Sequence, residues 1–228
     1  MMSHRRTLET IYRRLFALFG PQHWWPGETP FEVVVGALLT QNTAWSNASL
    51  AIARLKQAHL LHPSMLLRIP QGRLARLIHS SGYFNQKAKR LKTFVRYFHG
   101  KYGGSIRRMK EVPLNLVREE LLNLPGIGPE TADSILLYAL DKPTFVVDAY
   151  TRRILARHSI ISWDTSYEEI QRLFEKNLPR HASLFNEYHA LLVVLGKELC
   201  RTHPKCHLCP LRSVGKLRLE ETPAPLES

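Results

Sequence analysis

The residues that could do chemistry lie around a short glycine-containing turn. Residues 124–132 read LPGIGPETA between two helical patterns. Gly126 and Gly128 permit backbone angles that other residues resist, and Pro129 suits the first position of a new helix. Backbone N–H groups at such a helix start attract phosphate without reading base sequence. The segment predicts a phosphate-binding hairpin, although an ordinary helix end followed by a turn is the alternative.

Asp148 is the candidate charged group. It follows the apolar residues 145–147 and precedes the helical pattern of residues 149–157. Its simplest role is an N-cap whose carboxylate accepts a backbone N–H. The same position would keep the carboxylate ionised and oriented, which is what a group stabilising developing positive charge requires.

Helical signals dominate the elements that must position these residues, so the prediction is an all-α fold. Thr29, Pro30 and Glu32 form an N-terminal signature in which Glu32 can close a capping box. Apolar residues recur at helical spacing in residues 31–40, 47–57, 114–124 and 184–200, while alternation of the β type is almost absent.

The composition favours a polyanionic partner. The chain has 228 residues, of which 44% are hydrophobic, and its formal net charge is +13. Nucleic acid is the first candidate for such a basic chain, and charge that only maintains solubility is the alternative. No apolar run is long enough for a membrane span, and three Cys confined to one segment do not fit a disulfide-bonded secreted protein. We expect a cytoplasmic, nucleoid-associated protein.

The hairpin, the helix after it and Asp148 together resemble the helix-hairpin-helix superfamily of endonuclease III. The resemblance implies a two-lobed all-α DNA glycosylase fold with a DNA cleft between the lobes, and it makes Asp148 the catalytic carboxylate. The predicted divisions are a bundle at 29–140, a second lobe from 1–28 and 141–199, a Cys loop at 200–216 and a disordered tail at 217–228.

The residue after the hairpin separates two chemistries. In the bifunctional members that the chain resembles, a Lys there attacks the sugar and nicks the strand. This chain has Glu130 instead, and a carboxylate cannot form an imine. The resemblance therefore implies a monofunctional glycosylase. The alternatives are a bifunctional glycosylase and abasic-site lyase acting on oxidised pyrimidines, with another Lys supplying the amine, and a non-catalytic DNA-binding module.

The blocks at 24–26, 38–43 and 81–90 are similar to those of 3-methyladenine DNA glycosylase III, a branch of this superfamily. The resemblance implies excision of an alkylated, 3-methyladenine-like base, with the aromatic faces of a base pocket attracting its positive charge. The pocket residues would be Trp24, Trp25, Pro26 and Trp45, although packing in the core is the commoner role of Trp. The predicted DNA contacts are Gln41, Asn42, Lys87, Lys89, Arg90, Gly126, Ile127, Gly128, Glu130 and Thr131.

Among these contacts, the resemblance makes Gln41 the residue inserted into the gap left by the extruded base, with Asn42 beside it. A polar turn ending a helix is the alternative for both. Lys87, Lys89 and Arg90 would bind phosphate, and a solvated basic face is the alternative for each. The expected partner is double-stranded DNA containing damaged bases, bound by a monomer.

Cys200, Cys206 and Cys209 follow the last helix. The superfamily that the chain resembles often carries four Cys here around a [4Fe-4S] cluster, but the fourth, expected near Gly215, is missing. Three thiolates with an outside ligand, or with His203 or His207, could hold a cluster or zinc. A loop without metal is the alternative, and we expect no other cofactor.

Overall fold

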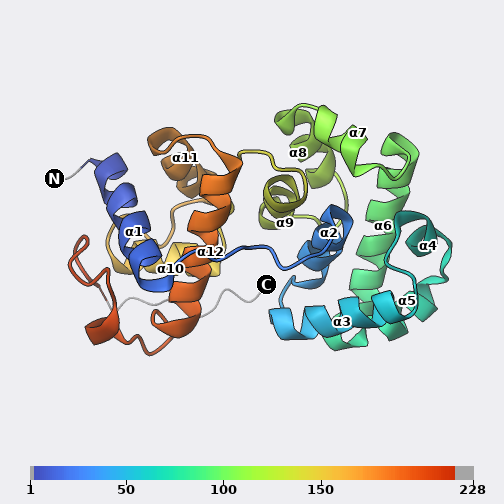
Figure 1. The fold of residues 1–228 in the computed structure, drawn as a ribbon, viewed down its shortest axis with the longest axis horizontal. Helices are drawn as coiled ribbons and strands as arrows, with labels where there is room; N and C mark the ends of the chain where they lie inside the picture. Colours follow the sequence, from blue (N-terminus) through green and yellow to red (C-terminus); the bar gives the residue numbers. More distant parts are fainter. Residues whose placement is uncertain (1–2, 219–228) are drawn as a thin grey trace. The chain divides into compact units, whose positions relative to one another are not determined.

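The computed structural model describes residues 3–218, and every regular element within that range is helical. The predicted all-α fold is confirmed. Figure 1 labels the α-helices, and the chain divides into two compact units. Unit 1 comprises residues 1–24 and 143–228, and unit 2 comprises residues 25–142.

Unit 1 contains both ends of the described chain. Its elements are α1 (His4–Phe19), α10 (Ala149–Arg157), α11 (Tyr167–Asn177), α12 (Ala182–Glu198) and the 3₁₀ turn η3 (Cys206–Leu208).

Unit 2 is formed by one continuous stretch of chain. Its elements are α2 (Pro30–Leu39), α3 (Trp45–Gln57), α4 (Pro63–Arg68), α5 (Gln71–Leu77), the 3₁₀ turn η1 (His79–Ser81), α6 (Phe84–Tyr102), α7 (Ile106–Glu111), α8 (Leu114–Leu122), α9 (Pro129–Ser134) and the π-helix η2 (Ile135–Ala139). Within the described residues no helix combines the length and the apolar character needed to cross a membrane.

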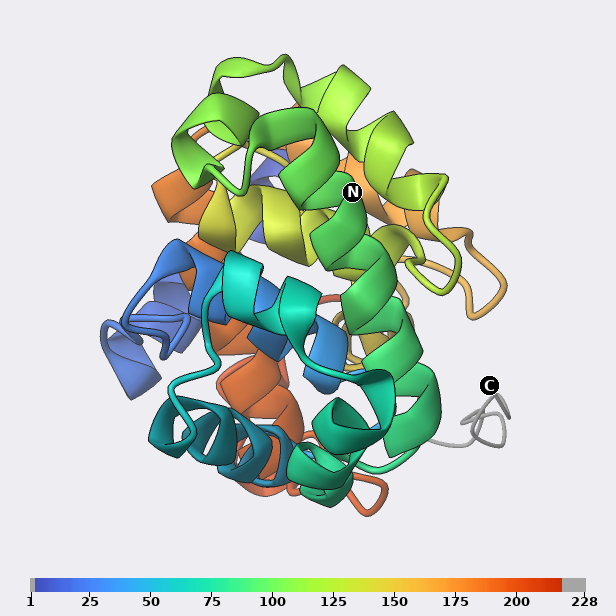
Figure 2. The same cartoon turned by 90° about the vertical axis from the view of Figure 1, so that its right-hand side faces the viewer.

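The core of unit 2 forms around α2, whose residues Phe31–Leu39 are all buried. Thr29 caps the helix by accepting the backbone N–H of Glu32 at 3.1 Å. In the predicted capping box the Glu32 carboxylate would accept the N–H of Thr29. It accepts instead the N–H of Glu28, one residue before the N-cap. Helices α3, α6 and α9 and the π-helix η2 pack against α2, and Figure 2 shows the long α6 beside α4 and α5.

A buried ion pair joins the two helices that flank the hairpin. Arg118 of α8 binds both carboxylate oxygens of Asp133 in α9, at 2.7 and 3.0 Å, and the Asp133 side chain is fully buried. Such a two-point pair fixes orientation as well as distance. The turn at residues 123–128 is therefore set by the packing of α8 on α9 as well as by its glycines.

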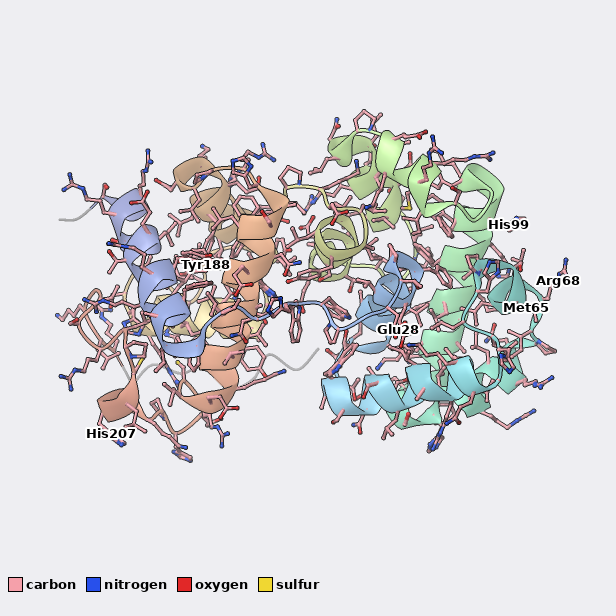
Figure 3. The ribbon with its side chains drawn as sticks, viewed as in Figure 1. Glu28, Met65, Arg68, His99, Tyr188 and His207 are labelled. Atoms are coloured by element: carbon pink, nitrogen blue, oxygen red, sulfur yellow. The ribbon has the colours of Figure 1, made fainter. Side chains whose placement is uncertain are left out.

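The core of unit 1 anchors the segment that leads into Asp148. The Phe145 ring stacks on Phe174 of α11, with ring centroids 3.7 Å apart. Tyr188 of α12, labelled in Figure 3, donates its hydroxyl to the carbonyl of Leu8 in α1 at 2.8 Å. These contacts join α1, α11 and α12 around the apolar residues that precede α10.

The first two residues of the predicted tail contact unit 1. Arg218 donates its backbone N–H to the carbonyl of Arg157 at 2.7 Å, and Leu217 lines a small cavity beside Cys200. The disorder predicted for residues 217–228 stays a prediction. The rest of the predicted tail, 219–228, lies outside the described residues.

Candidate DNA-binding and catalytic site

Only one of the two hairpin glycines uses a backbone angle reserved for glycine. Gly126 has φ +85°, whereas Gly128 has φ −92° and ψ 177°, an extended conformation open to any residue. The prediction that both need glycine freedom is corrected for Gly128. Both glycines are exposed, while Ile127 between them is 5% exposed and anchors the turn.

Gln41 is docked on the hairpin. Its Nε2 donates to the Gly126 carbonyl and to the Thr131 hydroxyl, both at 2.9 Å, and its Oε1 accepts from Arg90 at 2.6 Å. A Cβ on Gly126 would lie 2.4 Å from Arg90 Nε, so the hairpin glycine also makes room for this arginine. Asn42, directly after Gln41, is exposed and has φ +51°. The polar turn at 41–42 is thus part of the hairpin surface.

The two predicted phosphate-binding lysines of α6 have different environments. Lys89 is exposed, but Lys87 is 1% exposed and donates to the carbonyls of Leu39 and Ser81 at 2.9 and 2.6 Å. Burial, and then the nearby Arg90, lower the pKa of Lys87 to about 8. We therefore correct the phosphate contact predicted for Lys87, since its ammonium ties the end of α2 to η1 inside unit 2.

The two residues that follow Pro129 differ in exposure. Glu130 lies in the first turn of α9 and is exposed. Thr131 is buried and binds Gln41 through its hydroxyl. Of these two, only Glu130 is placed to meet a partner in solution.

The predicted base-pocket residues belong to both units. In unit 2 the Trp25 ring lies edge-on to Trp45, with centroids 5.3 Å apart, and 5.2 Å from the Tyr138 ring. A Cβ on Gly36 would lie 3.1 Å from Trp25 Nε1, so α2 carries a glycine where these rings pack. Pro26 is exposed. Trp24 is assigned to unit 1, where the Lys197 ammonium lies 5.7 Å from its ring centroid.

Asp148 is the N-cap of α10, as one of the two sequence interpretations has it. Its Oδ1 accepts the backbone N–H of Thr151 at 2.7 Å, and its Oδ2 lies 3.6 Å from Nε2 of His189 in α12. The Asp148 side chain is 12% exposed. Burial raises the pKa of this carboxyl, but His189 and the Thr151 hydrogen bond lower it by more, so the pKa lies below its ordinary value. The carboxylate is held ionised, which charge stabilisation requires.

The structure adds three residues that the sequence did not single out. His189 contacts Asp148 from a distant helix, and Tyr138 joins the Trp pair from a π-helix whose register the sequence does not reveal. Tyr83 keeps a 64% exposed ring on left-handed backbone, with φ +43°. Strained, exposed positions of this kind gather at functional sites, and an aromatic directly after Gly82 was the available signal.

Comparison with known proteins supplies the family. Residues 35–180 match the family described as HhH-GPD superfamily base excision DNA repair protein. The chain belongs to this superfamily. A relative from Methanocaldococcus jannaschii, provisionally named as a DNA repair glycosylase, is 46% identical and covers 89% of this chain and 92% of its own length. Endonuclease III of Thermotoga maritima is 32% identical over 90% of this chain and 91% of its own length.

Solved structures agree with this membership. The crystal structure of H. pylori 3-methyladenine DNA glycosylase bound to 1,N6-ethenoadenine is 29% identical, with a TM-score of 0.74 over 86% of this chain and 98% of that chain. A non-covalent endonuclease III–DNA complex has a TM-score of 0.81 at 24% identity, over 96% and 97% of the two chains, and shows a shared fold. This HhH-GPD chain is a DNA repair N-glycosylase, and the predicted enzyme class is confirmed.

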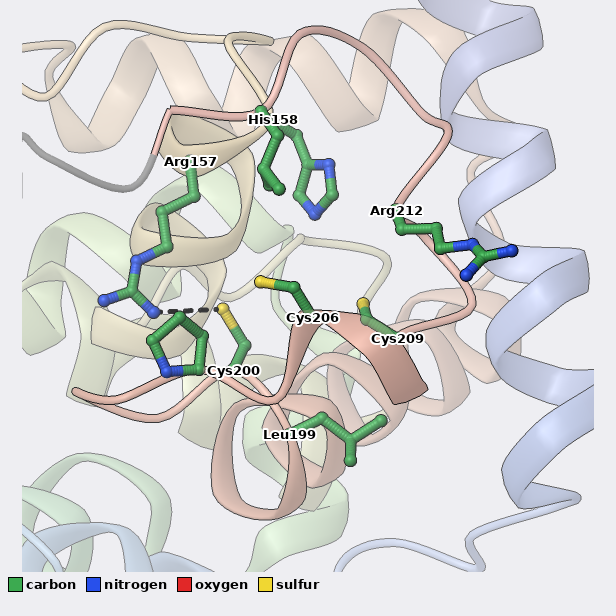
Figure 4. Close-up of a pocket in the computed structure, with 9 residues that line it drawn as sticks. Arg157, His158, Leu199, Cys200, Cys206, Cys209 and Arg212 are labelled. Carbon is green, nitrogen blue, oxygen red and sulfur yellow. Dashed lines mark hydrogen bonds between the residues drawn. The ribbon is translucent and has the colours of Figure 1, made fainter.

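The Cys loop of this HhH-GPD chain does not fit a cluster held by four cysteines. Three thiols line a cavity of about 10 Å³, the room of roughly one water molecule (Figure 4). Gly215, near which the fourth cysteine was expected, has φ +68°, and a Cβ there would lie 2.1 Å from the His158 carbonyl oxygen. Burial raises the pKa of the Cys209 thiol, which disfavours the thiolate that metals bind.

A buried arginine holds this loop instead. Arg157 donates to the carbonyls of Arg201 and Thr202 at 2.6 and 3.2 Å and lies 3.5 Å from Cys200 Sγ, the contact dashed in Figure 4. His203 and His207, the other predicted ligands, are exposed. Within residues 3–218 no group of three or more His, Cys, Asp or Glu side chains is arranged to hold a metal ion. We therefore assign no step of the reaction to a metal.

Proposed function

We propose that this glycosylase removes an alkylated purine of the 3-methyladenine type from double-stranded DNA by hydrolysis and leaves an abasic site. Two features support the substrate class. Trp25, Trp45 and Tyr138 gather aromatic rings in unit 2. The H. pylori enzyme with a similar structure is named for 3-methyladenine and was crystallised with an alkylated-type adenine, 1,N6-ethenoadenine.

Asp148 would act on the sugar. As the N-glycosidic bond breaks, its electron pair leaves with the base and the anomeric carbon gains positive charge. An ionised carboxylate stabilises that charge, then orients a water and accepts its proton while the water oxygen bonds to carbon. A cationic alkylated base becomes neutral as it leaves. It therefore needs no general acid.

The aromatic cluster would receive the extruded base. A cation over an aromatic face gains electrostatic attraction from the ring, and the gain increases when water is excluded. Trp25 and Trp45 offer such faces, and Tyr138 packs beside them. Pro26 keeps its proposed place beside this cluster, and the base-pocket role of Trp24, which belongs to unit 1, stays a prediction. Stacking and charge would then select an alkylated purine over a neutral base.

The hairpin surface of unit 2 would bind the DNA backbone. Gly126 and Gly128 are exposed and carry no side chain that would keep a phosphate from the backbone, and Lys89 and Arg90 add positive charge. Gln41 would leave its docked position to enter the gap left by the extruded base. The proposed contacts are Gln41, Asn42, Tyr83, Lys89, Arg90, Gly126, Gly128 and Glu130, while the buried Ile127 and Thr131 would support the turn from within unit 2.

The proposal of hydrolytic chemistry rests on the presence of Glu130. Where a bifunctional enzyme of this superfamily would need an amine, this chain has an exposed carboxylate, which cannot form a Schiff base. A second function, excision of oxidised pyrimidines with strand nicking, is favoured by the identity to several relatives named endonuclease III, of which the Thermotoga maritima protein is 32% identical.

The test uses duplexes that carry methylated adenine, uracil or thymine glycol at one position. Base release and strand breaks are scored separately, with and without alkali. We expect release of methylated adenine, and strand breaks only after alkali. Release of thymine glycol in preference to methylated adenine would overturn the substrate class. A covalent protein–DNA adduct trapped by borohydride, with breaks before alkali, would overturn the hydrolytic chemistry.

A further inference from the structure

We propose that His189 is a positioning residue for Asp148, which holds the second oxygen of the carboxylate and so fixes the plane in which the group meets the sugar. This inference rests on the proposed function of Asp148. It assigns a role to a buried imidazole that the mechanism above does not use.

The two oxygens of Asp148 have different partners. Oδ1 accepts the Thr151 N–H at 2.7 Å and so belongs to the helix cap. Oδ2 faces Nε2 of His189 at 3.6 Å. A cap alone fixes one oxygen and leaves the carboxylate able to turn about its last bond, whereas partners on both oxygens fix its plane.

The environment makes this second contact effective. The His189 and Asp148 side chains are 6% and 12% exposed, so water screens their interaction weakly. His189 projects from α12, and α12 packs against α10, the helix that Asp148 caps. The imidazole is therefore placed by a packed helix pair. The Asp148 side chain keeps the larger exposed fraction of the two.

The distance favours orientation over proton transfer. A separation of 3.6 Å exceeds a normal hydrogen bond, so the contact acts as a short electrostatic attraction. Contacts at catalytic groups are often longer without substrate than with it. His189 opposes the rise in the Asp148 pKa that burial alone would produce. Without it, the carboxylate would be freer to turn and easier to protonate.

The test compares two buried histidines of unit 1. His189→Phe removes the imidazole beside Asp148, and His189→Gln keeps a side-chain N–H donor. His158→Phe is the matched control, because His158 is 3% exposed and binds the Val214 carbonyl at 2.8 Å. Each variant is compared with the parent and with Asp148→Asn. The measurements are melting temperature, affinity for a duplex with an uncleavable abasic analogue, and the single-turnover rate of methylated adenine release from methylated duplex DNA.

We expect His189→Phe to slow base release by about tenfold to a hundredfold with affinity near that of the parent, since small misplacements at a reacting centre cost this much. His189→Gln should recover part of the rate, and His158→Phe should lower the melting temperature alone. The inference is overturned if His189→Phe is as fast as the parent, or if all three histidine variants slow in proportion to their melting temperatures. Parent-like release by Asp148→Asn would instead overturn the proposed function.

Discussion

The hairpin surface of unit 2 and the Asp148 site of unit 1 are built in opposite ways. At the hairpin the exposed residues are the glycines, and the side chains of Gln41 and Arg90 hold the turn. At Asp148 the functional group is a side chain, nearly buried, with a separate partner for each oxygen. One region keeps polar groups open to solvent, and the other encloses a charge.

The difference follows from what each region must bind. Phosphate is a strongly hydrated anion, and exposed amides at a helix start can exchange water for phosphate without moving. A carboxylate that stabilises a transient cation acts best where water is scarce and its orientation is already fixed. Substitutions should therefore affect binding at the hairpin and rate at Asp148.

The largest effect should come from Asp148→Asn. Asparagine caps helices about as well as aspartate, so the melting temperature should stay near that of the parent. The negative charge is lost, and single-turnover base release should fall by about a hundredfold or more. The control is Asp148→Ala, which loses the cap and should lower both the rate and the melting temperature. Equal melting temperatures for the two variants would contradict the cap.

The next largest effect, on DNA binding and stability, should differ between alanine substitutions at the two hairpin glycines. Gly126→Ala places a side chain at φ +85° and against Arg90, so it should cost more than about 1 kcal/mol of unfolding free energy and weaken DNA binding. Gly128→Ala has open space and an ordinary φ, so the fold should tolerate it. Urea unfolding and fluorescence anisotropy with duplex DNA measure the two quantities. A comparable loss of stability in both variants would show that the difference in backbone angle does not matter.

The smallest effect on function should come from Lys87→Met. This variant tests whether the buried Lys87 ammonium stabilises the junction of α2 and η1. Removing the ammonium leaves the Leu39 and Ser81 carbonyls without this donor, at about 1–3 kcal/mol of unfolding free energy for each unpaired group. Lys92→Met is the matched control, since Lys92 is 6% exposed and binds the carbonyls of Leu66, Leu67 and Ile69. Both variants should have a lower melting temperature than the parent and the same salt dependence of DNA binding. A weaker salt dependence for Lys87→Met would restore Lys87 as a phosphate contact.

The contribution of Lys87 to the free energy of unfolding should change with pH in a defined direction. The pKa of Lys87 is about 8 in the fold and 10.5 by its ordinary value. Between these values the unfolded chain binds the proton more tightly, so the parent gains stability as pH rises through this window. Lys87→Met lacks this gain. Its stability deficit relative to the parent should therefore widen from pH 8 toward pH 10 in urea unfolding.

The local sequence pattern was sufficient to predict much of the fold. Helix periodicity, the cap at Thr29 and the segment from the hairpin to Asp148 are properties of neighbouring residues, and they predicted the all-α fold and the superfamily. The capping position of Asp148 was also readable, because a short acidic residue before a helical pattern is a local signal.

Tertiary structure decided which of these residues reach solvent and which meet each other. Lys87 and Lys89 are two positions apart on one helix, yet the first turns inward to α2 and η1 and the second outward, which no spacing rule separates for two lysines. Gln41 contacts the hairpin, and His189 contacts Asp148, only because packed helices bring distant segments together. The sequence by itself determined the elements and the charged group, and the packing of those elements determined that group's surroundings, because burial and long-range contact do not exist before the chain folds.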